Sequence, residues 1–159
     1  MTPQVCFFLS IAFSVVAWSV VAQRYIWPKL KALPRADALR PILMVHSFRF
    51  IGLAFLVSGV VSPALPSTFA HADAYGDLGA AILALLSLAA LSAGGFGIAV
   101  VWIFNVWGTI DLLDAFYQGN AVGLIPGQLG AMYFVPTLLV PLLLITHVLT
   151  FRILLKNPK

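Results

Sequence analysis

The chain has 159 residues, of which 62% are hydrophobic and 9% charged, and its mean hydropathy is +1.03. Soluble domains carry about 25% charged residues, so this composition excludes a water-soluble globular protein. It predicts an all-α integral membrane bundle with residues 1–159 in one transmembrane domain. The net charge of +4 does not indicate a nucleic-acid partner, because the basic residues gather at the ends of apolar segments. The lone Cys6 excludes oxidoreductases that need paired cysteines.

Five apolar segments are long enough to cross a bilayer, which requires about 20 residues of helix. The first is expected to remain in the protein, because its first positive charge, Arg24, follows the apolar run instead of preceding it as in a signal peptide. The least obvious division lies at Gly94-Gly95, where a glycine pair favours a turn between two antiparallel helices. The predicted spans are residues 3–27, 39–61, 77–93, 96–116 and 131–155.

The distribution of basic residues predicts the orientation of these spans. Five of them lie between residues 24 and 40, and three more follow residue 151, whereas residues 62–76 and 117–130 contain no lysine or arginine. Basic loops face the cytoplasm. Five spans therefore place the N-terminus outside and the C-terminus inside, and we expect a multi-pass protein of the cell membrane, in a bacterial inner membrane.

Arg49 lies in the middle of the second predicted span, where a charge that cannot be lost needs a partner. His46 is three residues away and shares its face of the helix. On the antiparallel fourth span, Asn105 is expected at the depth of Arg49, and Asp111 about 9 Å further out, within reach of an extended arginine. These residues predict either a ligand-binding or proton-handling site or a structural ion pair. Asp114 shares the face of Asp111 but lies near the outer surface.

His46 and His147 are expected at similar depths on the second and fifth spans. Two histidines on different helices are what bis-histidine ligation of haem b requires, and neutral imidazoles also bind other metals. No third ligand is evident nearby, so a structural or ligand-contacting role remains the alternative. His71, Asp73 and Asp77 match a metal site of one nitrogen and two oxygen ligands, but the simpler interpretation is that Asp77 caps the third span.

Several features are predicted to shape the bundle. Asp77 and Asp111 both lie on the outer side, where they can line one cavity that Tyr75 also contacts. The third span is rich in small residues, which favours close packing inside the bundle or a homo-oligomer contact. Pro141 is expected to kink the fifth span. Residues 119–130, between the last two spans, form either a lid over the bundle or a plain connector.

Four functions remain compatible with the sequence. The first is binding or translocation of a small apolar or anionic molecule, a lipid or a proton at an intramembrane polar site. The second is electron transfer by haem b held between His46 and His147. The third is an enzyme acting on a lipid or other apolar substrate, with Asp111 or a histidine as general base and Arg49 holding an anionic group. The fourth is a structural accessory subunit. The expected partners are the lipid bilayer, a small apolar or anionic ligand and a second copy of the chain that packs through the third span, and no nucleic acid is expected.

Overall fold

The computed structural model describes residues 1–156, which form only helices, turns and loops, with no β-strand among them. Five helices are long and apolar enough to cross a membrane, which confirms the predicted all-α class and the number of segments. A multi-pass membrane protein is the class that such a set of helices indicates. These helices are Pro3–Leu30, Arg35–Leu56, Ser67–Ala90, Gly95–Ala121 and Val135–Leu155.

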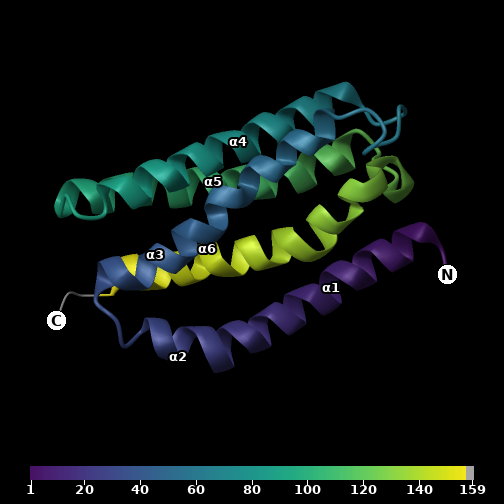
Figure 1. Cartoon of the computed structure of the whole chain (residues 1–159). Helices are drawn as coiled ribbons and strands as arrows, with labels where there is room; N and C mark the ends of the chain where they lie inside the picture. The colour runs from purple at the N-terminus through teal and green to yellow at the C-terminus, as the bar shows by residue number, and fades with distance from the viewer. Residues whose placement is uncertain (157–159) are drawn as a thin grey trace.

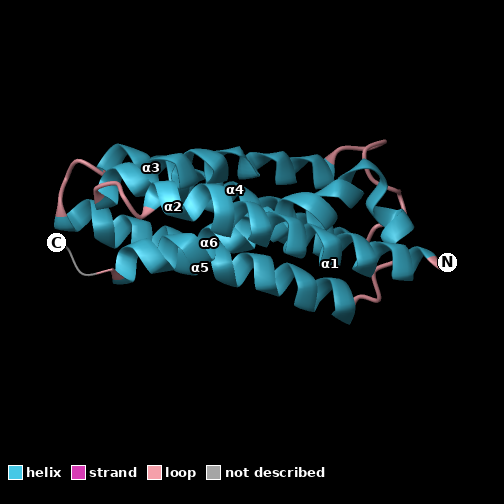
Figure 2. Ribbon diagram, turned by 90° about the horizontal axis from the view of Figure 1, so that it is seen from below, coloured by secondary structure: helices cyan, strands magenta, loops and turns pink. Residues whose placement is uncertain are grey.

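The five helices run alternately up and down, so the chain termini lie at opposite ends of an elongated bundle (Figure 1). Residue 1 lies at one end with loop 57–66 and segment 122–134, and this end is called the N-terminal end below. The loops 31–34 and 91–94 lie at the other end together with Lys156, and this is the C-terminal end. Nearly all of the chain between these loops is helical (Figure 2).

The first helix lies along one side of the bundle (Figure 1). It comprises α1 (Pro3–Val21), the π-helical turn η1 (Ala22–Ile26) and α2 (Trp27–Leu30). Helix α1 packs mainly against the last helix, where the Trp18 indole donates a hydrogen bond to the backbone oxygen of Leu138 at 3.2 Å. Most of its large apolar side chains remain exposed, as expected for a helix surrounded by lipid.

Prolines account for two irregular turns. A π-helical turn precedes Pro28, and a second one, η4 (Val135–Leu139), precedes Pro141 at the start of α6 (Val140–Leu155). Proline supplies no backbone N–H and crowds the preceding turn, and wider π turns are one way in which a helix accommodates such a residue. The kink expected at Pro141 stays a prediction, and the structure shows a π-helical turn directly before this residue.

The core at the C-terminal end is apolar. Helix α3 (Arg35–His46) packs there against the α4–α5 hairpin and α6, and Leu39, Leu43 and Phe104 are fully buried. Helix α4 (Ser67–Ala90) joins α5 (Gly95–Ala121) through a turn in which Gly94 has φ +60°, a conformation that favours glycine. The glycine pair thus marks the turn that the sequence predicts.

The third long helix begins at Ser67 instead of residue 77, so the prediction that Asp77 caps it is wrong. Asp77 lies more than two turns inside α4 and is buried, and Pro66 precedes the first turn. The prediction placed residues 62–76 in a loop and Asp77 at the start of the helix that follows it. Asp77 instead enters the bundle because a buried cation neutralises it, as described below. The small residues of α4, including Ala80 and Ala84, pack inside the chain against its neighbouring helices.

Several further helix boundaries differ from the prediction. The second long helix begins at Arg35 instead of residue 39, and the fourth continues to Ala121 instead of residue 116. The second long helix ends at Leu56 instead of residue 61, because Val57 is extended and Gly59 has φ +86°. The last helix begins at Val135 instead of residue 131, after the 3-10 helix η3 (Pro126–Tyr133), which contains Gly130 at φ +54°. The chain needs these turns to close the N-terminal end of the bundle.

Candidate functional site

The polar centre of the bundle is built on η2 (Ser47–Leu56), a 3-10 segment that continues α3. A 3-10 helix has three residues per turn, so side chains three apart lie directly above one another, whereas on an α-helix they drift around the axis. His46, Arg49, Gly52 and Phe55 therefore form a single row, and all four are buried. Ten residues of 3-10 helix are unusual, since most such stretches have only three or four.

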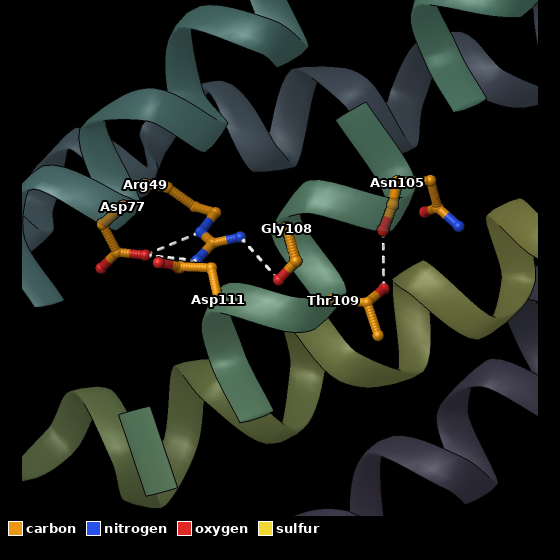
Figure 3. Close-up of polar contacts among 6 residues, drawn as sticks. All are labelled: Arg49, Asp77, Asn105, Gly108, Thr109 and Asp111. Atoms are coloured by element: carbon orange, nitrogen blue, oxygen red, sulfur yellow. Dashed lines mark hydrogen bonds and ion pairs between the residues drawn. The ribbon is translucent and has the colours of Figure 1, made fainter. Parts of the chain in front are cut away.

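Arg49 forms ion pairs with two aspartates from different helices (Figure 3). Its Nε donates to Oδ1 of Asp77 on α4 at 2.7 Å, and its Nη2 donates to Oδ2 of Asp111 on α5. Nη1 also donates to the backbone oxygen of Gly108 at 3.3 Å. The arginine is only 2% exposed and each of its nitrogens has an acceptor, so it offers little to an anionic ligand.

Three glycines make room for this network. A β-carbon at Gly52 would overlap the Asp77 carboxylate, and one at Gly76 would overlap that of Asp111. A β-carbon at Gly108 would lie 2.7 Å from Nε2 of His147 and 2.9 Å from Nη1 of Arg49. Small residues allow helices in lipid to approach closely. Here the absence of side chains at three positions admits the charged groups of the neighbouring helices.

The predicted histidine pair lies next to the arginine. His46 Nε2 is 2.9 Å from Oγ1 of Thr146, and His147 Nδ1 is 2.7 Å from Oδ1 of Asn105. The Asn105 amide also donates to the backbone oxygen of His147 at 3.3 Å. Asn105 therefore holds His147, and among residues 1–156 it makes no hydrogen bond to Arg49. The other ring nitrogens, Nδ1 of His46 and Nε2 of His147, are buried without a hydrogen-bond partner among the described residues.

The two imidazoles do not fit bis-histidine ligation in this arrangement. Such ligation places the rings on opposite faces of the porphyrin. The ring centroids of His46 and His147 are 4.3 Å apart, which is a contact distance, and Phe104 packs against both rings. No space for a macrocycle lies between them. Within residues 1–156 no three His, Cys, Asp or Glu side chains form a group that could hold a metal ion.

A pocket of about 330 Å³ opens beside the ion pairs toward the N-terminal end. Among residues 1–156, Asp73 and Asp77, one turn apart on α4, are the only charged residues that line it, and the rest of its wall is mainly apolar. Segment 119–130, predicted as a lid or a connector, supplies much of that wall. Hydrogen bonds from Gln128 to the backbone of Ala64 at 2.9 Å, and from Ala131 N to Val60 O at 2.8 Å, fasten it to loop 57–66.

The remaining predicted residues lie outside this pocket. Asp114 is exposed and accepts a hydrogen bond from Gln118. Tyr75 is 58% exposed and lies beside His71, whose Nδ1 is 2.7 Å from the Ser67 backbone oxygen. The sequence did not predict Asp73 as part of this pocket and indicated it only as one of three possible metal ligands. Its spacing of four from Asp77 was the available signal, because residues four apart share a helix face once the helix is known to start at Ser67.

The chain belongs to the family whose model is described as "Domain of unknown function (DUF8737)", which matches residues 6–155. No curated protein and no solved structure matches the chain. The family match covers all five long helices apart from the first residues of the first one, and therefore the whole site.

Proposed function

We propose that the protein is a multi-pass membrane protein that binds a small, mainly apolar molecule in the pocket at the N-terminal end. The observation that carries the proposal is the pocket itself, a space of about 330 Å³ within a helical bundle. Ligand sites are typically clefts of about 300–1,000 Å³ with mostly apolar walls and a few polar groups that fix orientation. This pocket has that composition, with Phe55, Phe69 and Leu112 among its buried walls and two carboxylates on one side.

The ion-pair network lies beside this pocket and fixes the position of one of its walls. Arg49 ties η2, α4 and α5 together through Asp77 and Asp111, and Asp77 also lines the pocket. Groups that must hold a ligand work best when their own positions are fixed by further hydrogen bonds. The network therefore orients the Asp77 carboxylate while it fixes the packing of three helices.

Binding is favoured over passage through the bundle by the filling of the C-terminal end. Beyond His46 and His147 the interior consists mainly of apolar side chains such as Leu39, Leu43 and Val101, and the only fully buried polar side chains there among residues 1–156 are the hydroxyls of Ser87 and Thr150. A translocation path needs polar groups or a water-filled space across the whole bilayer. The pocket is therefore a closed-ended site, reached from its own end of the bundle.

The pocket is proposed to lie toward the outer side of the membrane. Arg24, Lys29, Lys31 and Arg35 lie near the C-terminal end with Arg152, whereas the loops at the N-terminal end carry no lysine or arginine. The positive-inside rule then places the C-terminal end in the cytoplasm.

The ligand proposal is tested with a neutral probe, 4-phenylbutanol, bound to the protein in lipid nanodiscs, with empty nanodiscs to subtract partitioning. We expect saturable binding that is lost in Ala115→Trp, which fills the pocket. Leu113→Trp adds the same indole to the exposed face of α5 and should bind as the wild type does. Absence of saturable binding, or equal binding by both variants, would reject the pocket as a ligand site.

The orientation is tested with single cysteines in a Cys6→Ser background. Ala64 and Ala32 are exposed in loops at opposite ends of the bundle. A membrane-impermeant maleimide applied to intact cells should modify Ala64→Cys and leave Ala32→Cys unmodified until the cells are opened. The reverse pattern would overturn the orientation without affecting the pocket.

A further inference from the structure

We propose that the ligand is an amphipathic cation, a small amine or quaternary ammonium compound whose positive group lies at Asp73 and Asp77 and whose apolar part lies against the aromatic wall. This inference rests on the proposed ligand-binding function and adds the chemical class of the ligand. Three features carry it: the sign of the charge in the pocket, a carboxylate without a partner, and the aromatic composition of the remaining wall.

The first feature is that every charge lining the pocket is negative. Asp73 and Asp77 are its charged residues, and no lysine, arginine or histidine of the described part of the chain lines it. The imbalance extends along the sequence: between Arg40 and Arg152 the only basic residue other than histidine is Arg49, and four aspartates lie in the same stretch. An anionic ligand would therefore meet repulsion, whereas a cation would be attracted.

The second feature is that Asp73 has no compensating partner. Asp77 and Asp111 share the single guanidinium of Arg49. Among residues 1–156 the Asp73 side chain makes neither a hydrogen bond nor an ion pair, although it is only partly exposed and faces the pocket. A carboxylate in surroundings of low polarity is costly unless a positive group or a proton neutralises it. A bound cation supplies that group at the place where the pocket has space.

The third feature is the aromatic wall. Cations are attracted to the faces of aromatic rings, and cages of such rings are a common means of holding quaternary ammonium groups. The same rings offer apolar area to the rest of an amphipathic molecule. Two of them, Phe7 and Phe8, come from α1, so the pocket lies between the first helix and the rest of the bundle. The phenylalanines that line the pocket are Phe7, Phe8, Phe55, Phe69 and Phe116.

The pocket favours a free small molecule over a phospholipid. A volume of about 330 Å³ lies at the lower end of the range for small-molecule sites and cannot enclose two acyl chains. A phospholipid headgroup would also bring a phosphate next to Asp73 and Asp77, where like charges repel. The recognised chemistry is therefore one positive charge on a compact apolar body.

The test compares three probes of similar size that share a phenyl group on a short alkyl chain and differ in the head group: cationic 4-phenylbutylamine, neutral 4-phenylbutanol and anionic 4-phenylbutyrate. Binding is measured in nanodiscs of zwitterionic lipid at one pH and one salt concentration. We expect the amine to bind roughly 10- to 100-fold more tightly than the alcohol, as for one charge-assisted hydrogen bond. The carboxylate should bind more weakly than the alcohol. A short-chain phosphatidylcholine serves as the lipid probe and should not compete with the amine.

The role of Asp73 is tested with a charge-removing substitution and a matched control. Asp73→Asn should abolish the preference for the amine and leave the affinity for the alcohol nearly unchanged. Asp114→Asn removes the same charge at the same end of the bundle but outside the pocket, and should keep the preference. Asp73→Glu retains the charge and should also keep it, which separates the loss of charge from any disturbance of folding.

The outcomes distinguish this inference from the function on which it rests. Equal affinities of the amine and the alcohol would overturn the cation proposal while leaving the pocket as a binding site for neutral molecules. A preference for the amine that persists in Asp73→Asn would also overturn it. Competition by the phosphatidylcholine would identify a lipid as the occupant instead. Failure of all three probes to bind would reject the proposed function itself.

Discussion

The two halves of this bundle are built on different principles. Toward the C-terminal end, the helices bury mainly leucine, isoleucine, valine and alanine side chains against one another. Toward the N-terminal end, Arg49 on a 3-10 segment forms ion pairs with two aspartates from neighbouring α-helices, and a pocket remains beside them. Lipid tails are as apolar as leucine, so apolar packing alone gives helices weak specificity in a membrane. The comparison indicates that the polar half fixes which helices meet, while the apolar half closes the bundle.

The largest loss of stability is expected from a substitution of Arg49. Replacing it by methionine leaves Asp77 and Asp111 as buried, unpaired carboxylates, so Arg49→Met should lower the free energy of unfolding by about 3–5 kcal/mol. The midpoint of SDS-induced or thermal unfolding of the purified protein measures the loss. The double variant Arg49→Met/Asp77→Asn should be more stable than the sum of the single losses implies, because it removes one of the stranded charges. Strictly additive losses would show that the ion pairs do not act as a unit.

A cavity in the C-terminal half should lower the free energy of unfolding less than the loss of a charge in the polar half does. Leu43 is fully buried, and Leu43→Ala should cost about 2 kcal/mol, at the lower end of the range for such changes. The substitution removes packing contacts and nothing else. In a membrane the leucine side chain has apolar surroundings in the unfolded state as well, so no hydrophobic transfer energy is lost. The unfolding midpoint should fall, while saturable binding of 4-phenylbutanol in nanodiscs should persist. Loss of probe binding in Leu43→Ala, which changes no residue of the pocket, would show that the two halves are coupled.

A third prediction concerns the glycines that admit the carboxylates. Gly76→Ala should destabilise the protein by about 1–2 kcal/mol, since its β-carbon overlaps Asp111 and displaces an ion-pair partner. Gly79→Ala, one turn along α4, is the matched control: its β-carbon would lie 3.4 Å from Nε1 of Trp107, an ordinary contact. The control should be neutral or stabilising, because alanine is the better helix former. Equal effects of the two substitutions on the unfolding midpoint would contradict the close-approach explanation.

The smallest effect is expected at Asp114, an acidic residue of the same half that takes no part in the network. It is exposed and accepts a hydrogen bond only from Gln118, one turn along the same helix. Asp114→Asn should therefore change the free energy of unfolding by less than about 0.5 kcal/mol, the usual range for exposed positions. A loss comparable with that of Asp111→Asn would mean that the charge of this end as a whole, and not the ion pairs, determines stability.

The number of helices and one of the two ion-pair partners of Arg49, Asp111, could be predicted from the sequence. Hydropathy depends on composition over about 20 residues, which is why the five segments and the turn at Gly94-Gly95 match the structure. Helical rise also placed Asp111 within the reach of Arg49, and the structure has them in contact. The burial of Asp77 was not predictable in the same way, because a lone aspartate near an apolar segment usually marks its end.

Tertiary structure decided the remainder for a physical reason. A charged residue enters an apolar interior only when an opposite charge is already placed there. For Asp77 and Asp111 that charge is Arg49, which lies 28 and 62 positions away in the chain, respectively. The 3-10 register that aligns His46, Arg49 and Phe55 likewise depends on contacts between helices, since no local propensity favours it over an α-helix. The sequence by itself determined the class of the protein and the inventory of its polar groups. Packing between helices determined that Asp77 is a buried ion-pair partner, that His46 and His147 touch, and that a pocket remains beside Asp73, because each depends on distances that only the assembled bundle defines.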